Sequence, residues 1–127
     1  MIEVCSYKDL IVWQKSIDLV VEIYKITDLF PKYELFNLTT QMRRSGISIS
    51  SNIAEGKGRG TRKDFSHFLK LALGSANELE TQIEIAKRLD YIEKNKDFEG
   101  LLTEIMKMLN KLISSLDYKT PNSPPNT

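Results

Sequence analysis

The chain has 127 residues, 41% of them hydrophobic and 28% charged, which is the length and composition of one soluble globular domain. Its 18 basic and 17 acidic residues leave a formal net charge of +1, which excludes a global electrostatic preference for nucleic acid or membranes. One cysteine, Cys5, and one histidine, His67, exclude an intramolecular disulfide and argue against a structural zinc site, which needs about four ligands.

The first predicted helix spans residues 8–30, because neither glycine nor proline interrupts this segment and Pro31 ends it. It carries two apolar faces that lie roughly opposite each other at about 100° of rotation per residue. We assign one face to the core: Leu10, Trp13, Ile17, Val20 and Tyr24. We assign the other face to an oligomer interface: Val12, Leu19, Ile23, Ile26 and Phe30.

A single small bundle buries only one such face, and a contiguous exposed apolar face usually marks a protein interface. Helix one therefore predicts self-association. The alternative is that the helix sits deep in the bundle and is covered on both sides.

The second predicted helix starts after Lys32-Tyr33-Glu34 and continues to about Gly56. Its apolar stripe consists of Leu38, Met42, Ile49 and Ile53. Residues 46–50 alternate with period two, as an exposed strand would. We prefer a helix, because a lone strand among helices has no partner to pair with.

The clearest break in the chain is Lys57-Gly58-Arg59-Gly60, since each glycine lowers helix propensity by about 1 kcal/mol relative to alanine. We predict a loop here, followed by Thr61 as the N-cap of a third helix that ends near Tyr91. One face of this helix is apolar: Phe65, Phe68, Leu69, Ala72, Ala76, Leu79, Ile83 and Ala86. A flank beside that face is apolar at its ends and polar within: Leu71, Ser75, Glu78, Gln82, Ile85 and Leu89.

A fourth apolar stripe completes the pattern: Phe98, Leu101, Leu102, Ile105, Met108, Leu109, Leu112, Ile113 and Leu116. Four stripes predict an all-α fold, an antiparallel up-down four-helix bundle that forms a single domain over residues 1–118. Residues 119–127 contain three prolines and two asparagines, and we expect a disordered C-terminal tail there.

The sequence contains no constellation typical of an enzyme. His67 has no catalytic motif around it, and residues 56–61 lack both the spacing of a P-loop and the strand that precedes one. Glu55 and Glu78 are interpreted as structural polar residues, because paired acidic and basic groups on a helix flank more often stabilise than catalyse. We expect no catalytic residues, no cofactor and no bound metal.

The densest positive region is formed by Lys57, Arg59, Arg62 and Lys63, offset by neighbouring acidic residues. Basic side chains on a glycine-rich loop before a helix N-terminus suit the phosphates of nucleic acids. Together with Arg43 and Arg44, they form the predicted nucleic-acid-binding set. The alternative, a solvated loop with ordinary surface charge, stays open.

The N-terminus predicts a cytoplasmic protein. Residues 1–6 lack the basic segment and long apolar run of a secretion signal. No stretch approaches the roughly 20 apolar residues of a membrane span, so we expect no membrane partner.

Several blocks occur in an order that resembles the bacterial four-helix proteins encoded in 23S rRNA intervening sequences, over about residues 7–116. The blocks are DLIVWQK at residues 9–15, LTTQMRR at 38–44, SNIAEGKGR at 51–59 and GSANELETQ at 74–82. Gly46, Ser48 and Gly60 depart from the usual pattern of that family and put the end of the second helix in doubt.

The resemblance implies a bundle assembled as a ring, a homopentamer, without catalytic activity. The family is also similar to the accessory protein of diversity-generating retroelements, a pentameric bundle that binds nucleic acid and a reverse transcriptase through positive surface. We therefore expect a non-enzymatic homo-oligomer that binds RNA, DNA or a ribonucleoprotein, with a protein such as a reverse transcriptase as a further candidate partner. The alternative is a protein scaffold ring with no direct contact to nucleic acid.

Overall fold

The structure is a computed structural model that describes residues 6–93 and 98–118. It contains four α-helices, α1 (Ile11–Thr27), α2 (Leu38–Arg59), α3 (Arg62–Arg88) and α4 (Phe98–Asp117). Short 3-10 helices at Tyr7–Asp9 and Lys32–Glu34 precede α1 and α2. The expectations for Cys5 and for a disordered tail at residues 119–127 lie outside the described residues.

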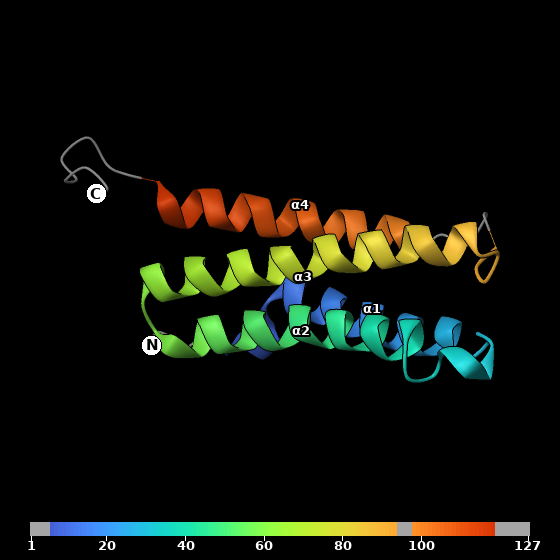
Figure 1. The fold of residues 1–127 in the computed structure, drawn as a ribbon. Coiled ribbons are helices and arrows are strands. Elements are labelled where there is room, and N and C mark those ends of the chain that lie inside the picture. The colour runs from blue at the N-terminus through green and yellow to red at the C-terminus, as the bar shows by residue number, and fades with distance from the viewer. Residues whose placement is uncertain (1–5, 94–97, 119–127) are drawn as a thin grey trace.

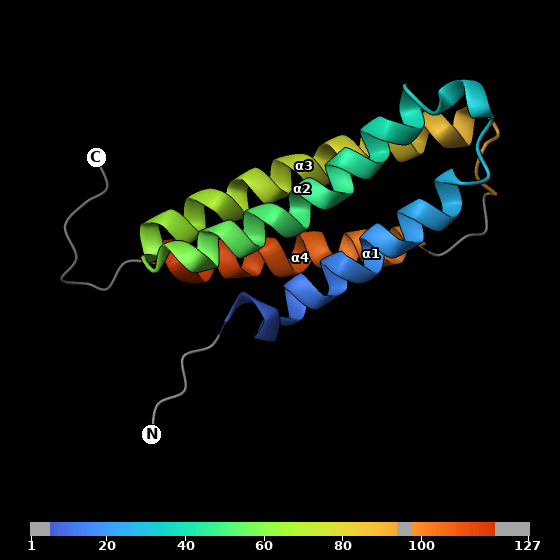
Figure 2. The ribbon, with the colours of Figure 1, turned by 90° about the horizontal axis from the view of Figure 1, so that it is seen from below.

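The helices form an antiparallel up-down bundle (Figure 1), as predicted. Each helix packs against its neighbours in the sequence, and α4 closes the bundle against α1. Seen from below, α1 and α4 lie along one side and α2 and α3 along the other (Figure 2). Residues 46–50 are helical, so the prediction of a helix over the rival strand is confirmed.

The assignment of the two faces of α1 was wrong. The residues assigned to an oligomer interface, Val12, Leu19, Ile23, Ile26 and Phe30, are only 0–7% exposed and belong to the core. On the face assigned to the core, Leu10, Trp13, Ile17 and Val20 are half-buried, and Tyr24 is 42% exposed.

Side-chain chemistry explains which face is buried. The core face is mainly aliphatic, and its two buried hydroxyl groups make their hydrogen bonds inside the bundle. The Ser16 hydroxyl donates to the Trp13 carbonyl and accepts from Ser50. The Thr27 hydroxyl donates to the Ile23 carbonyl. The opposite face includes Trp13 and Tyr24, whose polar groups favour a position at the edge of the bundle, where water can reach them.

The predicted loop at residues 57–60 is mostly helix, because α2 continues through Gly56 and Gly58 to Arg59. Tight packing against α3 offsets the low helix propensity of glycine. A Cβ atom on Gly56 would lie only 2.6 Å from Cβ of Phe68, so this approach requires a glycine. Gly60, with φ of 85°, ends the helix in the left-handed conformation. Thr61 then caps α3, as predicted, by accepting a hydrogen bond from Asp64 N at 3.1 Å.

Candidate functional site

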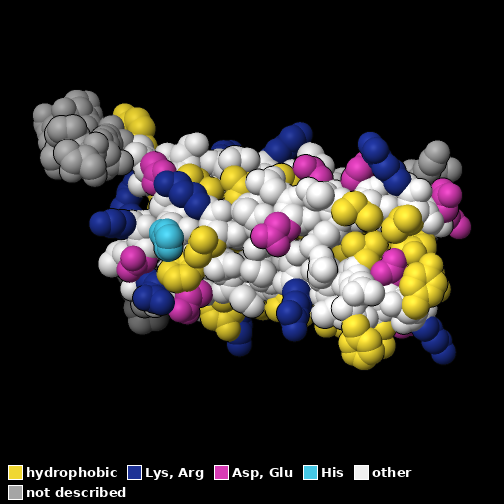
Figure 3. Space-filling view, in the orientation of Figure 1, with side chains coloured by type: hydrophobic (Ala, Val, Ile, Leu, Met, Phe, Trp, Pro, Cys, Tyr) yellow, Lys and Arg dark blue, Asp and Glu magenta, His cyan; other side chains and the backbone are white. Residues whose placement is uncertain are grey.

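The predicted basic cluster lies at one end of the bundle, where α2 turns into α3. Lys57 and Arg59 belong to the last turn of α2, and Arg62 and Lys63 to the first turn of α3. Lys and Arg side chains stand among acidic ones at this end, close to the single histidine (Figure 3). We call Lys57, Arg59 and Lys63 the basic end.

Aromatic rings support two of these cations. The Arg59 guanidinium lies 5.0 Å from the centre of the Phe68 ring, and the Lys57 ammonium lies 5.6 Å from that of Phe65. Cation–π contacts of this kind hold a charge in place while leaving its outer side in water. Arg59 also pairs with Glu55 at 3.0 Å, one helical turn away, and both side chains are about half exposed. Glu55 is thus part of a surface ion pair, which contributes little stability.

Arg62 has a different role from the other basic residues of this region. Its Nη2 group donates to the carbonyls of Ser115 at 3.1 Å and Leu116 at 3.2 Å, near the C-terminal end of α4. The last carbonyls of a helix lack partners within the helix, so this contact caps α4 and ties it to α3. Arg62 is engaged within the fold, and we therefore do not include it in the basic end.

Asp117, the last residue of α4, adds two contacts to α3. It accepts a hydrogen bond from the Ser66 hydroxyl at 2.6 Å and pairs with Lys70 at 2.9 Å. The Ser66 hydrogen bond, followed by that of Lys70, lowers the pKa of this carboxyl below its usual range. The basic side chains are therefore carried on a fixed junction of α2, α3 and α4.

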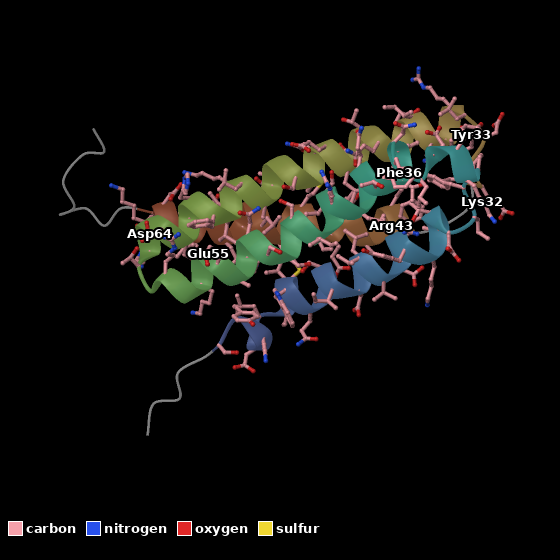
Figure 4. All side chains as sticks on the ribbon, turned by 60° about the horizontal axis from the view of Figure 1, so that its bottom comes forward. Lys32, Tyr33, Phe36, Arg43, Glu55 and Asp64 are labelled. Atoms are coloured by element: carbon pink, nitrogen blue, oxygen red, sulfur yellow. The ribbon has the colours of Figure 1, made fainter. Side chains whose placement is uncertain are left out.

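Arg43 and Arg44 do not join the basic end. Arg43 precedes Lys57 by 14 residues in the same helix, which is about 21 Å along its axis. Arg43 lies at the opposite end from Asp64 (Figure 4). Its guanidinium covers the Tyr24 ring at 4.4 Å, and its Nε donates to Thr27 Oγ1 at 2.9 Å. The predicted set of six basic residues therefore does not form one site.

Arg44 lines a groove of about 400 Å³ between α2 and α3. The other lining residues are Gln41, Ser45, Ser48, Ser75, Glu78 and Gln82. The hydroxyls of Ser48 and Ser75 lie 2.8 Å apart and join the two helices. Glu78, predicted to be a structural polar residue, is exposed at this groove rather than buried in an ion pair.

Sequence reasoning missed an exposed apolar corner between α1 and α2. Its large side chains are highly exposed: Leu29 76%, Tyr33 73%, Leu35 44% and Phe36 87%. The Tyr33 hydroxyl lies 3.0 Å from that of Tyr91, which in turn donates to Glu34 at 2.8 Å. These bonds hold the corner against the segment that follows α3. The sequence signal for this corner is a run of apolar residues without helical periodicity. Apolar stripes at helical spacing do not reveal such a run.

Metal-binding and membrane-spanning features are absent from residues 6–93 and 98–118. No three side chains of His, Cys, Asp and Glu within these ranges are placed to hold a metal ion. In the same part of the chain, no helix is long and apolar enough to cross a membrane.

Comparisons with known proteins agree with this architecture. No protein with a curated description matches the chain. The crystal structure of a protein of unknown function of the S23 ribosomal protein family, from Bacteroides thetaiotaomicron VPI-5482, is 34% identical, with a TM-score of 0.73. The match covers 82% of this chain and 96% of that protein. The model of the 23S rRNA-intervening sequence protein family matches residues 8–111, and the chain belongs to that family.

Proposed function

We propose that the protein is a non-enzymatic homo-oligomer that binds nucleic acid, or a ribonucleoprotein, through its basic end. The observation that carries this proposal is the grouping of Lys57, Arg59 and Lys63 in the last turn of α2 and the first turn of α3. Exposed cations next to a helix N-terminus suit phosphate groups. The name of the family, which refers to 23S rRNA, supports an RNA partner.

Assembly is supported by the second apolar face of helix one, which the corrected assignment places on the surface. We call Trp13, Ile17, Val20, Tyr24 and Ile47 the α1–α2 face. Tyr24 and Ile47 are 42% and 41% exposed, and the other three are half-buried. An apolar strip of this extent is typical of a protein interface. The subunit number, five, follows the family resemblance.

Repetition in a ring compensates for the low net charge of one chain. Each copy presents three cations, so one long nucleic acid that reaches several copies is held by many weak contacts. The alternative function is a scaffold ring that binds another protein, such as a reverse transcriptase. It is favoured by the exposed corner of Leu29, Tyr33, Leu35 and Phe36.

The test replaces Lys57, Arg59 and Lys63 by alanine and keeps Arg62, because Arg62 caps α4. A matched control replaces Lys25, Lys32 and Lys107, which are exposed elsewhere, and changes the net charge equally. We expect the wild type and the control to bind structured RNA with a steep salt dependence. The slope of log affinity against log salt should fall by roughly 0.7 to 0.9 for each lost contact in the basic-end variant.

Circular dichroism and light scattering should show the same helicity and mass for all three proteins. If the basic-end variant binds RNA like the control, the basic end is not the contact surface. If the wild type binds neither structured RNA, duplex DNA nor single strands at low salt, the scaffold function replaces the nucleic-acid one.

A further inference from the structure

Helix α2 separates two unlike surfaces of the bundle. On one side lies the α1–α2 face. Here Val20 packs against α2, because its Cγ2 atom lies 3.6 Å from the position that a Cβ atom on Gly46 would occupy. Arg43, stacked on Tyr24, lies one helical turn before Ile47 on the same side. This surface therefore combines exposed apolar side chains with the cation of Arg43.

On the other side of α2 lies the α2–α3 face, which contains the polar groove around Arg44, Ser75 and Glu78. Exposed apolar side chains flank the groove along α3: Leu71 at 45%, Ile85 at 45% and Leu89 at 48%. Figure 3 views the bundle with α2 and α3 across its centre, and apolar side chains gather toward the ends of a largely polar middle.

The groove has polar groups without partners. Oε1 of Gln82 is buried and accepts no hydrogen bond from the described residues, whereas buried polar atoms are nearly always paired. Glu78 and Arg44 form no ion pair with any residue of the described ranges. A surface with an unpaired acceptor, an unpaired carboxylate and exposed leucine and isoleucine side chains is suited to being covered by a protein.

We propose that a second copy of this chain covers it, by docking its α1–α2 face onto the α2–α3 face. This inference rests on the homo-oligomer proposed above. The groove holds one acidic and one basic side chain, Glu78 and Arg44, and the docking face brings Arg43. The ion pair that this contact offers is that of Arg43 with Glu78. The apolar residues around Tyr24 and Ile47 meet those that flank the groove.

The size of the surface fits a stable contact. The 22 residues of α2 extend about 33 Å, and two adjacent helices are about 20 Å wide. The resulting area is comparable to the roughly 800 Å² that each partner buries in a standard interface. Because the two faces differ, each copy uses one face for each neighbour. Such head-to-tail contacts close into rings when the rotation between copies allows it.

The test uses two double variants, each of which breaks one face. Tyr24→Glu with Ile47→Glu changes the α1–α2 face, and Glu78→Lys with Ile85→Lys changes the α2–α3 face. All four positions are exposed, so both variants should keep the helicity of the wild type. We expect each variant alone to fall to the mass of one subunit in light scattering and sedimentation.

An equimolar mixture of the two variants distinguishes this contact from others. Each mixed pair retains one intact α1–α2 face and one intact α2–α3 face, so the mixture should form a 1:1 dimer at high micromolar concentration and grow no further. Three results would overturn the inference: a mixture that stays monomeric, a single variant that keeps the wild-type mass, or a first variant that forms a dimer. Such a dimer would mean that the α2–α3 face pairs with itself.

Failure of the underlying proposal looks different. If the wild type is itself monomeric, both the proposed homo-oligomer and this contact are contradicted. If the wild type is oligomeric but the mixture of the two variants stays monomeric, only the contact is contradicted. If either double variant loses helicity, the single changes Ile47→Ser and Ile85→Ser replace them, with the same expected masses.

Discussion

The two apolar faces of α1 have the same periodicity but different surroundings. Val12, Leu19 and Ile23 point into the core and are almost inaccessible to water, whereas Trp13, Ile17 and Val20 are half-buried on the α1–α2 face. The buried face is mainly aliphatic, and the hydroxyl groups of Ser16 and Thr27 on it make their hydrogen bonds inside the bundle. The outer face carries aromatic side chains with polar groups. The comparison indicates that apolar spacing detects both faces, and that the chemistry of the side chains tells them apart.

A charge placed on each face of α1 should have the largest effect. Ile23 is 0% exposed, so Ile23→Lys buries an ammonium group without a partner and should cost several kcal/mol of folding free energy. We expect this variant to lose its helical circular dichroism signal. Val20→Lys is the matched control, because its longer side chain can extend to water from a half-buried site and leave the bundle folded. A folded Ile23→Lys variant of reduced mass would instead place Ile23 at an interface.

Alanine substitutions on the two faces of α1 should differ less strongly in their effect on stability. Leu19→Ala removes a fully buried side chain and should destabilise the bundle by about 2–5 kcal/mol, because it leaves a cavity. Ile17→Ala, on the half-buried face, should cost clearly less. Denaturant unfolding of both variants at one protein concentration measures the difference. Equal losses of unfolding free energy for the two variants would mean that Ile17 is buried as deeply as Leu19 in the assembled protein.

The sequence was sufficient for the fold class, the four helices and the N-cap at Thr61, because each depends on local spacing and side-chain chemistry. It was misleading at residues 57–59, where the low helix propensity of Gly58 predicted a loop but α2 continues to Arg59. Gly58 itself meets no neighbour that would require a glycine. The tertiary effect lies two residues earlier, at Gly56, whose close contact with Phe68 packs this end of α2 against α3.

The candidate site was less predictable than the fold. Lys57, Arg59 and Lys63 were found from their local density, but a basic residue that caps another helix, as Arg62 does, looks the same in a sequence as one that faces water. Arg43 was grouped with them, although the continuous helix α2 keeps it far away. The exposed corner at Tyr33 and Phe36 has no periodicity, and its exposure depends on how α1 and α2 are joined.

If repeated basic ends on an assembly bind nucleic acid, a monomeric variant should bind RNA more weakly than the wild type. The Glu78→Lys, Ile85→Lys variant keeps Lys57, Arg59 and Lys63 and adds positive charge, so charge alone predicts tighter binding. Our account predicts that its affinity for a long structured RNA, measured by fluorescence anisotropy, falls about 100-fold below that of the wild type, because multivalent contact is lost. If the monomeric variant binds this RNA as tightly as the wild type, repetition of the basic end does not contribute to binding.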